Sequence, residues 1–148
     1  MDEFVKLEHE MYVPDLVTSE VNEENVGILQ KYFLDKSINQ ESFSYHELTE
    51  IQLLEIQHGS LSIPDCSCLF LAKKKSATLL TGDARLRKVA ENENVPVHGI
   101  LWIFEELIRY GFITYATAHD KLLGLVNLNC RLPREEIEKI IIVWKKKM

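Results

Sequence analysis

The chain has 148 residues, 46% of them hydrophobic, and its 17 basic and 23 acidic residues give a net charge of −6. This length and hydrophobic content suffice for a core, so we expect a single domain over residues 1–148. The acidic balance argues against broad nucleic-acid binding driven by overall charge, while leaving room for local basic patches. No run reaches the roughly 18 apolar residues of a membrane span, and the acidic start is unlike a signal peptide. We therefore expect a cytoplasmic protein that is not bound to a membrane.

The first half of the chain predicts alternating helices and strands. The tail of a helix over residues 4–9 precedes a short strand over residues 11–14, which Pro14 closes. A helix over residues 18–35 follows, with Glu20 in its first turn. An edge strand over residues 38–44 and a helix over residues 45–58, ended by Gly59, complete this half.

The second half repeats the alternation and then turns helical. Ser62 is a typical cap, with Pro64 and Asp65 behind it, and predicts a helix that ends in the lysine run of residues 73–75. A buried strand over residues 77–80 and the turn Thr81-Gly82-Asp83 lead into a helix that ends near Asn92. A strand over residues 95–97 and helices over residues 100–110, 114–128 and 133–146 follow.

The three cysteines are an odd number, which argues against a disulfide framework and favours a reducing compartment. Cys66 and Cys68 are two residues apart on a predicted helix, where side chains do not face each other. Cys130 has no nearby ligand partner. We expect all three to be small buried hydrophobes.

Three acids stand at predicted helix starts, namely Glu20, Asp65 and Asp83. Parallel α/β sheets collect their chemistry at the carboxyl ends of strands, where the next helix begins, and Mg²⁺ prefers carboxylate oxygens. Taken singly, each acid has a structural explanation as a cap, a capping-box member or a first-turn charge. Taken together, they favour a site at one rim of the sheet.

Basic and aromatic residues near these acids have two interpretations. Arg85, Arg87 and Lys88, and the lysines of residues 73–75, could contact phosphates, but basic runs at helix ends are more often solvated surface. Trp102 and Phe104 are expected to pack in the interior instead of stacking on bases.

The order and spacing of several short pieces resemble a PIN domain, most closely its DUF3368 branch. The pieces are Leu61-Ser62 with Asp65, Leu79-Leu80-Thr81-Gly82-Asp83-Ala84-Arg85, Val95-Pro96-Val97-His98-Gly99, Gly111-Phe112-Ile113 and the late turn of residues 128–133. The resemblance implies a three-layer α/β/α fold with a central parallel sheet. It also implies RNA cleavage with Mg²⁺ or Mn²⁺, as in VapC-type toxins that pair with an antitoxin protein.

Carried over to this sequence, the resemblance makes Glu20, Asp65 and Asp83 the metal ligands and catalytic acids. Thr81 would support them by hydrogen bonding, and Thr81, Arg85 and Arg87 would bind the RNA substrate. PIN domains normally begin with a central strand that ends in an aspartate, the first metal ligand. No residue of this sequence supplies that strand, so we expect either that the given start lies too late or that the protein lacks a full site. Without the strand, we expect a weaker metal site and a rearranged segment or another chain that fills the gap.

Two functions follow from these expectations. One is a metal-dependent ribonuclease, the toxin of a toxin–antitoxin pair. The other is a non-catalytic or degenerate PIN-like module that binds a partner or dimerises. The last helices carry more apolar residues than one small sheet can cover, among them Ile137, Ile140, Ile141, Val143 and Trp144. This surplus favours a homodimer or an antitoxin complex, unless the last helix closes over the sheet.

Overall fold

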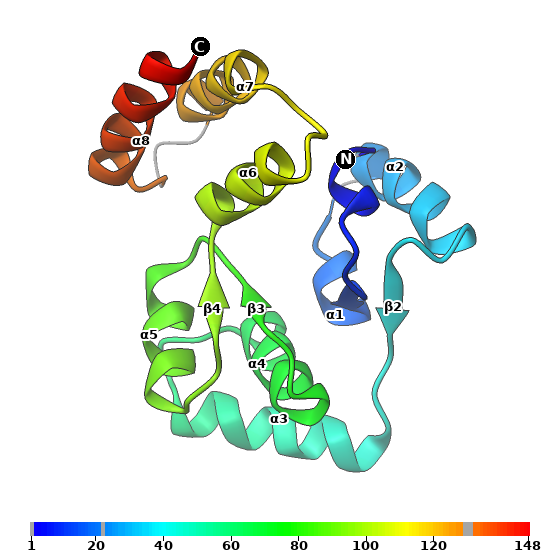
Figure 1. Ribbon diagram of the computed structural model, residues 1–148. Helices are drawn as coiled ribbons and strands as arrows, with labels where there is room; N and C mark the ends of the chain where they lie inside the picture. Colours follow the sequence, from blue (N-terminus) through cyan, green and yellow to red (C-terminus); the bar gives the residue numbers. More distant parts are fainter. Residues whose placement is uncertain (1, 22, 129–131) are drawn as a thin grey trace. The chain divides into compact units, whose positions relative to one another are not determined.

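The computed structural model describes residues 2–21, 23–128 and 132–148, and it divides into two compact units (Figure 1). The larger unit, residues 8–97, mixes short strands with helices. The smaller unit consists of residues 1–7 and 98–148 and is helical apart from the end of one strand. No helix in the described ranges is both long and apolar enough to cross a membrane.

Parallel pairing organises the strands of the larger unit. β1 (Tyr12–Pro14) runs parallel to β2 (Asn39–Glu41), and β3 (Leu79–Leu80) pairs with β4 (Val97–His98). The α/β class predicted from the sequence is confirmed, but the described strands form two two-stranded sheets in place of one central sheet. The strands have two or three residues, fewer than the usual five or six, so each pair offers few ladder hydrogen bonds. β1 and β3 both pack against α4 (Ile63–Lys75), which therefore connects the two sheets.

Local capping explains where the longer helices of this unit begin. α3 (Tyr45–Gln57) and α4 each start with a capping box, formed by Ser44 with Glu47 and by Ser62 with Asp65. α5 (Ala84–Asn92) starts at the side chain of Asp83. These starts and the predicted strands at β1 and β2 are confirmed.

The predicted helix over residues 18–35 is wrong in its first part. The structure has a short α1 (Asp15–Thr18) and a separate α2 (Glu23–Leu34). The Thr18 hydroxyl donates to the Asp15 carbonyl, and the Ser19 hydroxyl donates to the Leu16 carbonyl, both at 2.9 Å. Both bonds run back to carbonyls of the first turn, so the polar groups of this short helix are satisfied locally. Glu20 therefore lies in a turn after α1, not in the first turn of a helix.

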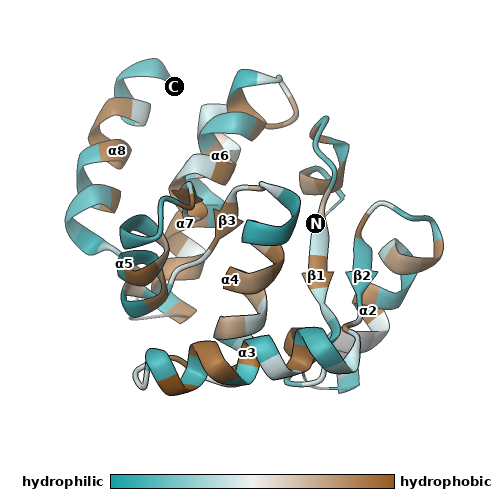
Figure 2. Ribbon diagram, turned by 90° about the horizontal axis from the view of Figure 1, so that it is seen from below, coloured by the Kyte–Doolittle hydropathy of each residue, from teal (hydrophilic) through white to brown (hydrophobic). Residues whose placement is uncertain are grey.

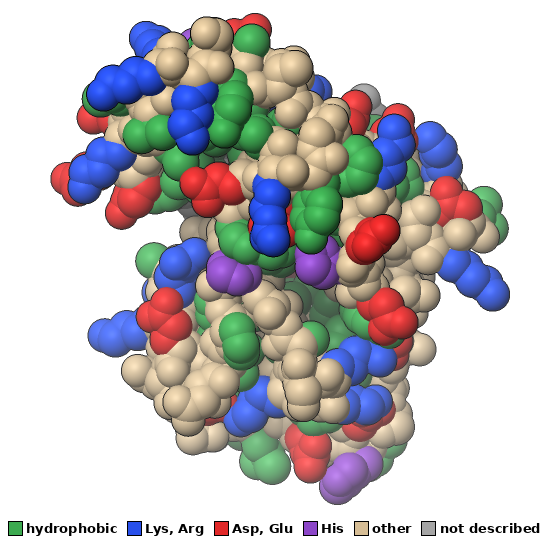
Figure 3. Space-filling model, viewed as in Figure 1, with side chains coloured by type: hydrophobic (Ala, Val, Ile, Leu, Met, Phe, Trp, Pro, Cys, Tyr) green, Lys and Arg blue, Asp and Glu red, His purple; other side chains and the backbone are tan. Residues whose placement is uncertain are grey.

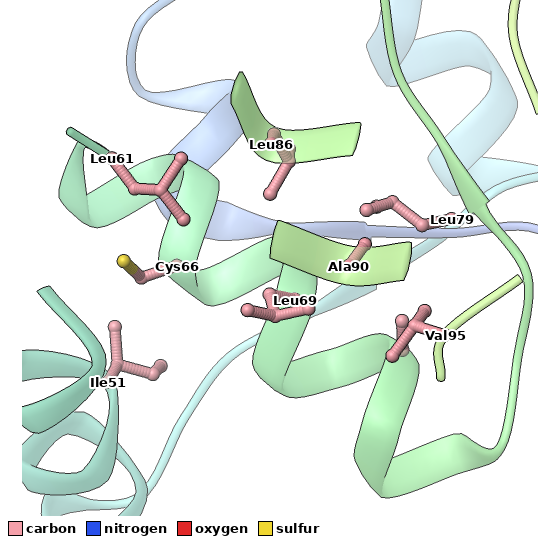
Figure 4. Packing of buried hydrophobic residues seen from close by; sticks show 9 residues of the cluster. Ile51, Leu61, Cys66, Leu69, Leu79, Leu86, Ala90 and Val95 are labelled. Atoms are coloured by element: carbon pink, nitrogen blue, oxygen red, sulfur yellow. The ribbon is translucent and has the colours of Figure 1, made fainter. Parts of the chain in front are cut away.

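The core of the larger unit lies among α3, α4 and α5. Figure 4 shows the side chains of Ile51 from α3, Leu69 from α4 and Ala90 from α5 gathered in one region. Cys66 and Leu69 are fully buried, and Ile51 and Leu86 nearly so. The interpretation of Cys66 as a small buried hydrophobe is confirmed, whereas Cys68 is half-buried and Cys130 lies outside the described residues.

Three helices form the smaller unit, together with a short 3₁₀ helix at Phe4–Lys6. They are α6 (Ile100–Arg109), α7 (Tyr115–Leu128) and α8 (Arg134–Lys147). Gly111, with a positive φ of 74°, follows the end of α6 in a conformation that favours glycine. α8 packs against α7.

Aromatic side chains contribute to the core of this smaller unit. The rings of Phe104 and Trp144 meet edge to face at 6.1 Å, and both side chains are buried. Trp102 stacks on His98 with ring centroids 4.6 Å apart. The prediction that Phe104 packs in the interior is confirmed. Trp144, expected to be available to another chain, is only 2% exposed.

Candidate functional site

Asp65 stands in the first turn of α4 with one carboxylate oxygen engaged. Its Oδ2 accepts a hydrogen bond from the Ser62 amide at 3.2 Å, and its own amide donates to the Ser62 hydroxyl at the same distance. The side chain is half-buried. Within the described residues, its Oδ1 accepts no hydrogen bond, so one oxygen is available to a further ligand.

Two of the predicted acids act on the same thiol. Burial first, then the Asp65 carboxylate and more weakly the Glu20 carboxylate, raise the pKa of Cys68 to about 11. α1 packs against α4, and the turn containing Glu20 directly follows α1 in the chain, whereas Asp65 lies in the first turn of α4.

Asp83 is held at the start of α5 by its own helix. Its Oδ1 accepts from the amides of Arg85 at 2.8 Å and Leu86 at 3.2 Å, and its Oδ2 lies 3.4 Å from the Arg85 guanidinium. Partial burial would raise the pKa of Asp83, but these hydrogen bonds and the guanidinium outweigh it and lower the pKa. The Thr81 hydroxyl accepts from the Asp83 amide at 3.1 Å and fixes the turn. Asp83 is therefore ionised and fixed in place.

The three acids do not form one metal cluster in the part of the chain that is described. No group of three or more His, Cys, Asp or Glu side chains there is arranged to hold a metal ion. Both oxygens of Asp83 are engaged by groups of its own helix. Mg²⁺ is commonly bound through one or two carboxylates together with waters and substrate phosphates. The pair Glu20 and Asp65 has the donor chemistry for such an ion, or for Mn²⁺.

The lysine run of residues 73–75 is neutralised by acids from three other elements. Lys73 pairs with Glu93, Lys74 with Glu47 at 2.8 Å, and Lys75 with Glu41 at 3.5 Å. The hydrogen bond from Lys74 is the main reason why the pKa of Glu47 falls to about 2. These pairs make the run a structural feature instead of a phosphate-binding surface.

Basic residues of α5 differ in their partners. Arg85 faces Asp83, whereas Arg87 and Lys88 are exposed and have no acidic partner among the described residues. Sequence reasoning missed that the charges of Asp65 and Glu20 both contribute to the raised pKa of Cys68. No local pattern signals it, because it depends on the packing of α1 against α4.

Short strand pairs and the helices packed on them make the larger unit an α/β domain, with acids at or near the starts of several helices. The DUF3368 family, described as a PIN domain, matches residues 1–146. The chain therefore belongs to the DUF3368 family of PIN domains. No curated protein and no solved structure gives a significant match to it.

Proposed function

We propose that the protein is a metal-dependent endoribonuclease of the PIN type that hydrolyses RNA phosphodiesters with Mg²⁺ or Mn²⁺. The observation that supports the proposal is the packing of α1, which the turn with Glu20 follows, against α4, whose first turn carries Asp65, in a chain of the PIN family. Because α1 and α4 are separate segments, their contact is a tertiary feature and not a by-product of helix capping.

Each residue has a separate task in this proposal. Glu20 and the open oxygen of Asp65 would hold the ion, which when bound supplies Lewis-acid activation of water and of the phosphoryl group. Asp83 keeps its negative charge at the start of α5, where the Thr81 hydroxyl fixes the turn before the helix. Arg87, exposed and without an acidic partner in the described chain, is the cation best suited to an RNA phosphate, and Arg85 is second because Asp83 already neutralises part of its charge.

The test is cleavage of end-labelled RNA by the purified chain, with Mn²⁺ or Mg²⁺ added and with EDTA. Glu20→Gln and Asp65→Asn remove one charge each, and asparagine preserves the acceptor that Ser62 uses. We expect each to lose more than about tenfold in activity, since loss of groups that merely support metal ligands already costs this much. Glu91→Gln, which removes an exposed carboxylate from α5, is the matched control and should keep its activity. Full activity of Asp65→Asn would contradict the proposal.

Metal binding gives a second readout that does not need RNA. Isothermal titration with Mn²⁺ should show binding that weakens in Glu20→Gln and Asp65→Asn and persists in Glu91→Gln. Asp83→Asn separates the roles further: if Asp83 acts only as a cap, this variant keeps both metal binding and cleavage, because asparagine is an equally good cap.

A biological role as the toxin of a toxin–antitoxin pair extends the same proposal. In that role the protein cuts cellular RNA and is neutralised by an antitoxin protein. Expression of the wild-type chain should then stop growth, and Asp65→Asn should relieve the arrest. Growth arrest by both chains alike would argue against RNA cleavage as its cause.

The second candidate function is a non-catalytic PIN-like module that binds RNA or a partner protein. The observation in its favour is that the described residues contain no group of three metal-binding side chains. This function predicts no Mn²⁺ binding, and RNA binding, if present, that is unaffected by EDTA and by Asp65→Asn. The titration described above therefore distinguishes the two functions.

A further inference from the structure

The C-terminal end of α6 is fixed by a tight turn. The amide of Gly111 donates to the Ile108 carbonyl at 3.0 Å, and the amide of Phe112 donates to the Leu107 carbonyl at 2.9 Å. Together with the positive φ of Gly111, these two hydrogen bonds form a Schellman motif. Because the motif fixes the backbone, the side chains of Tyr110 and Phe112 on either side of Gly111 leave the turn in defined directions.

The two aromatic rings of this turn stack on each other. Their centroids lie 6.5 Å apart, with an angle of 30° between the ring planes. Tyr110 is 47% exposed, whereas Phe112 is half-buried. In Figure 2 the ribbon of α6 ends in hydrophilic colours and becomes hydrophobic in the turn directly after it. The turn therefore presents a phenol ring that is supported by a second ring and partly open to solvent.

A cation lies beside the exposed ring. The guanidinium carbon of Arg109 is 5.5 Å from the centre of the Tyr110 ring, and the Arg109 side chain is 71% exposed. Its Nη1 lies 3.3 Å from Oε1 of Glu106, its one acidic partner in the described part of the chain. An arginine carries five N–H donors, so this contact leaves others for a further acceptor. Figure 3 shows hydrophobic side chains reaching the surface next to Lys and Arg side chains over the smaller unit.

Helix capping does not explain the ring of Tyr110. The Schellman motif accounts for Gly111 and for an apolar residue at Phe112, but it does not require an aromatic residue before the glycine. The other exposed tyrosine of the described chain is Tyr45, at the start of α3 and 88% exposed. Within the described residues, no second ring stacks on Tyr45 and no cation lies over it. Tyr110 thus combines exposure, a stacked ring and a cation.

We propose that Tyr110, with Arg109 beside it, is a stacking site for an unpaired base of RNA. Aromatic rings and arginine guanidinium planes are the surfaces on which proteins stack unpaired RNA bases. The open part of the Tyr110 ring takes the base, and the guanidinium contacts the neighbouring phosphate. The inference rests on the proposed function for its ligand, RNA, but it needs neither the metal nor cleavage.

The preference among RNA ligands follows from the same two side chains. A base inside a duplex is covered by its neighbours on both faces, so the site selects single-stranded over double-stranded RNA. Stacking strength grows with the size of the base, which favours purines over pyrimidines. An apolar peptide could cover the ring, but it would leave the Arg109 charge without a partner. The charge therefore favours a nucleotide, which offers a base and a phosphate together.

Binding without cleavage tests the site. Fluorescence anisotropy of a short labelled oligoadenylate is titrated with the full chain in EDTA at low salt. Tyr110→Ala should weaken binding at least about fivefold, as expected for the loss of one stacked base, and Tyr110→Phe, which keeps the ring, should bind like the wild type. Arg109→Gln should weaken binding and reduce its dependence on salt. Tyr45→Ala, which removes an exposed ring from α3, is the matched control and should leave the affinity unchanged.

A direct contact gives an independent readout. An oligoadenylate that carries one 5-iodouridine, irradiated in the complex, should crosslink to the peptide that contains Tyr110. Crosslinks confined to other peptides overturn the site. Circular dichroism melting of each variant separates loss of binding from loss of folding.

Several binding results would refute the stacking site. They are a wild-type chain that does not bind oligoadenylate, unchanged affinity in folded Tyr110→Ala, an equal loss in Tyr110→Phe, and equally tight binding of a duplex. The outcome is separate from that of the nuclease proposal. A chain that binds through Tyr110 but does not cleave RNA with Mn²⁺ has the stacking site and lacks the nuclease activity. A chain that cleaves RNA and binds it equally well after Tyr110→Ala has the activity and lacks the site.

Discussion

Replacing Leu69 by alanine should destabilise the larger unit by about 3–4 kcal/mol. Leu69 is fully buried on α4, with Ile51 of α3 and Ala90 of α5 beside it in the same cluster (Figure 4). Buried Leu→Ala changes cost about 2–5 kcal/mol, and the larger values occur where neighbours cannot collapse into the cavity. The surrounding side chains belong to separate helices with their own caps, which restricts such collapse. Alanine keeps the helical propensity of α4, so the loss reports on packing.

Urea unfolding followed by circular dichroism measures this loss. With a slope of about 1–3 kcal/mol per molar urea, a loss of about 3–4 kcal/mol should lower the midpoint by about 1–4 M. Leu53→Ala is the matched control, because Leu53 lies on α3 and is 59% exposed, and its midpoint should shift by less than about 0.5 M. Equal shifts in the two variants would refute the assignment of Leu69 to the core.

Tryptophan fluorescence, recorded in the same experiment, tests the expectation that the chain is a single domain. Trp102 and Trp144 both belong to the smaller unit. If the chain unfolds as one domain, Leu69→Ala shifts the fluorescence and circular dichroism transitions together. Separate transitions, with fluorescence unaffected by Leu69→Ala, would show that the two units fold independently.

Three further predictions concern the cap, an acid-sensitive contact and the thiols. Asp83→Ala should lower the free energy of unfolding by about 1 kcal/mol, and Asp83→Asn should leave it almost unchanged. Equal melting temperatures of the two variants would show that Asp83 does not stabilise α5 as its cap. Lys73, and less strongly His58, lower the pKa of Glu93 from its usual 4.5. Ionised Glu93 therefore stabilises the fold above that pH, and this contribution is lost as pH falls through the lower folded-state pKa. The stability difference between wild type and Glu93→Gln should therefore shrink below about pH 4 in urea titrations, and a constant difference would be inconsistent with this. Burial raises the pKa of both Cys66 and Cys68 to about 11. Both thiols should therefore react with iodoacetamide at about pH 8 far more slowly in the native chain than in urea, as measured by peptide mass spectrometry. Similar rates in the two conditions would contradict the burial of these thiols.

Helix starts could be predicted from the sequence because caps act on the adjacent backbone. Ser62 with Asp65 and the turn at Asp83 are local signals, and the structure has a helix after each. The break after Thr18 carried no comparable signal. Neither glycine nor proline marks it, and the hydroxyl bonds of Thr18 and Ser19 are equally compatible with a continuing helix.

Strand pairing and the arrangement of the acids depend on contacts between distant segments. The sequence predicted the strands, but their division into two pairs depends on how each packs against α4. In the same way, all three acids were predicted as site residues by their positions near helix starts. Only packing separates Glu20 and Asp65, which both act on Cys68, from Asp83, which faces its own helix.

The two lysine runs show most clearly what a sequence leaves open. Both are three lysines at the end of an amphipathic helix, and both suit the helix dipole equally well. On α4, glutamates from β2, α3 and the end of α5 reach all three, so the charges are used within the fold. On α8, no acid among the described residues pairs with the three lysines, and all three side chains are exposed. The same sequence pattern is therefore consumed inside the fold on one helix and left to solvent on the other, and only the tertiary neighbours of each helix decide which outcome occurs.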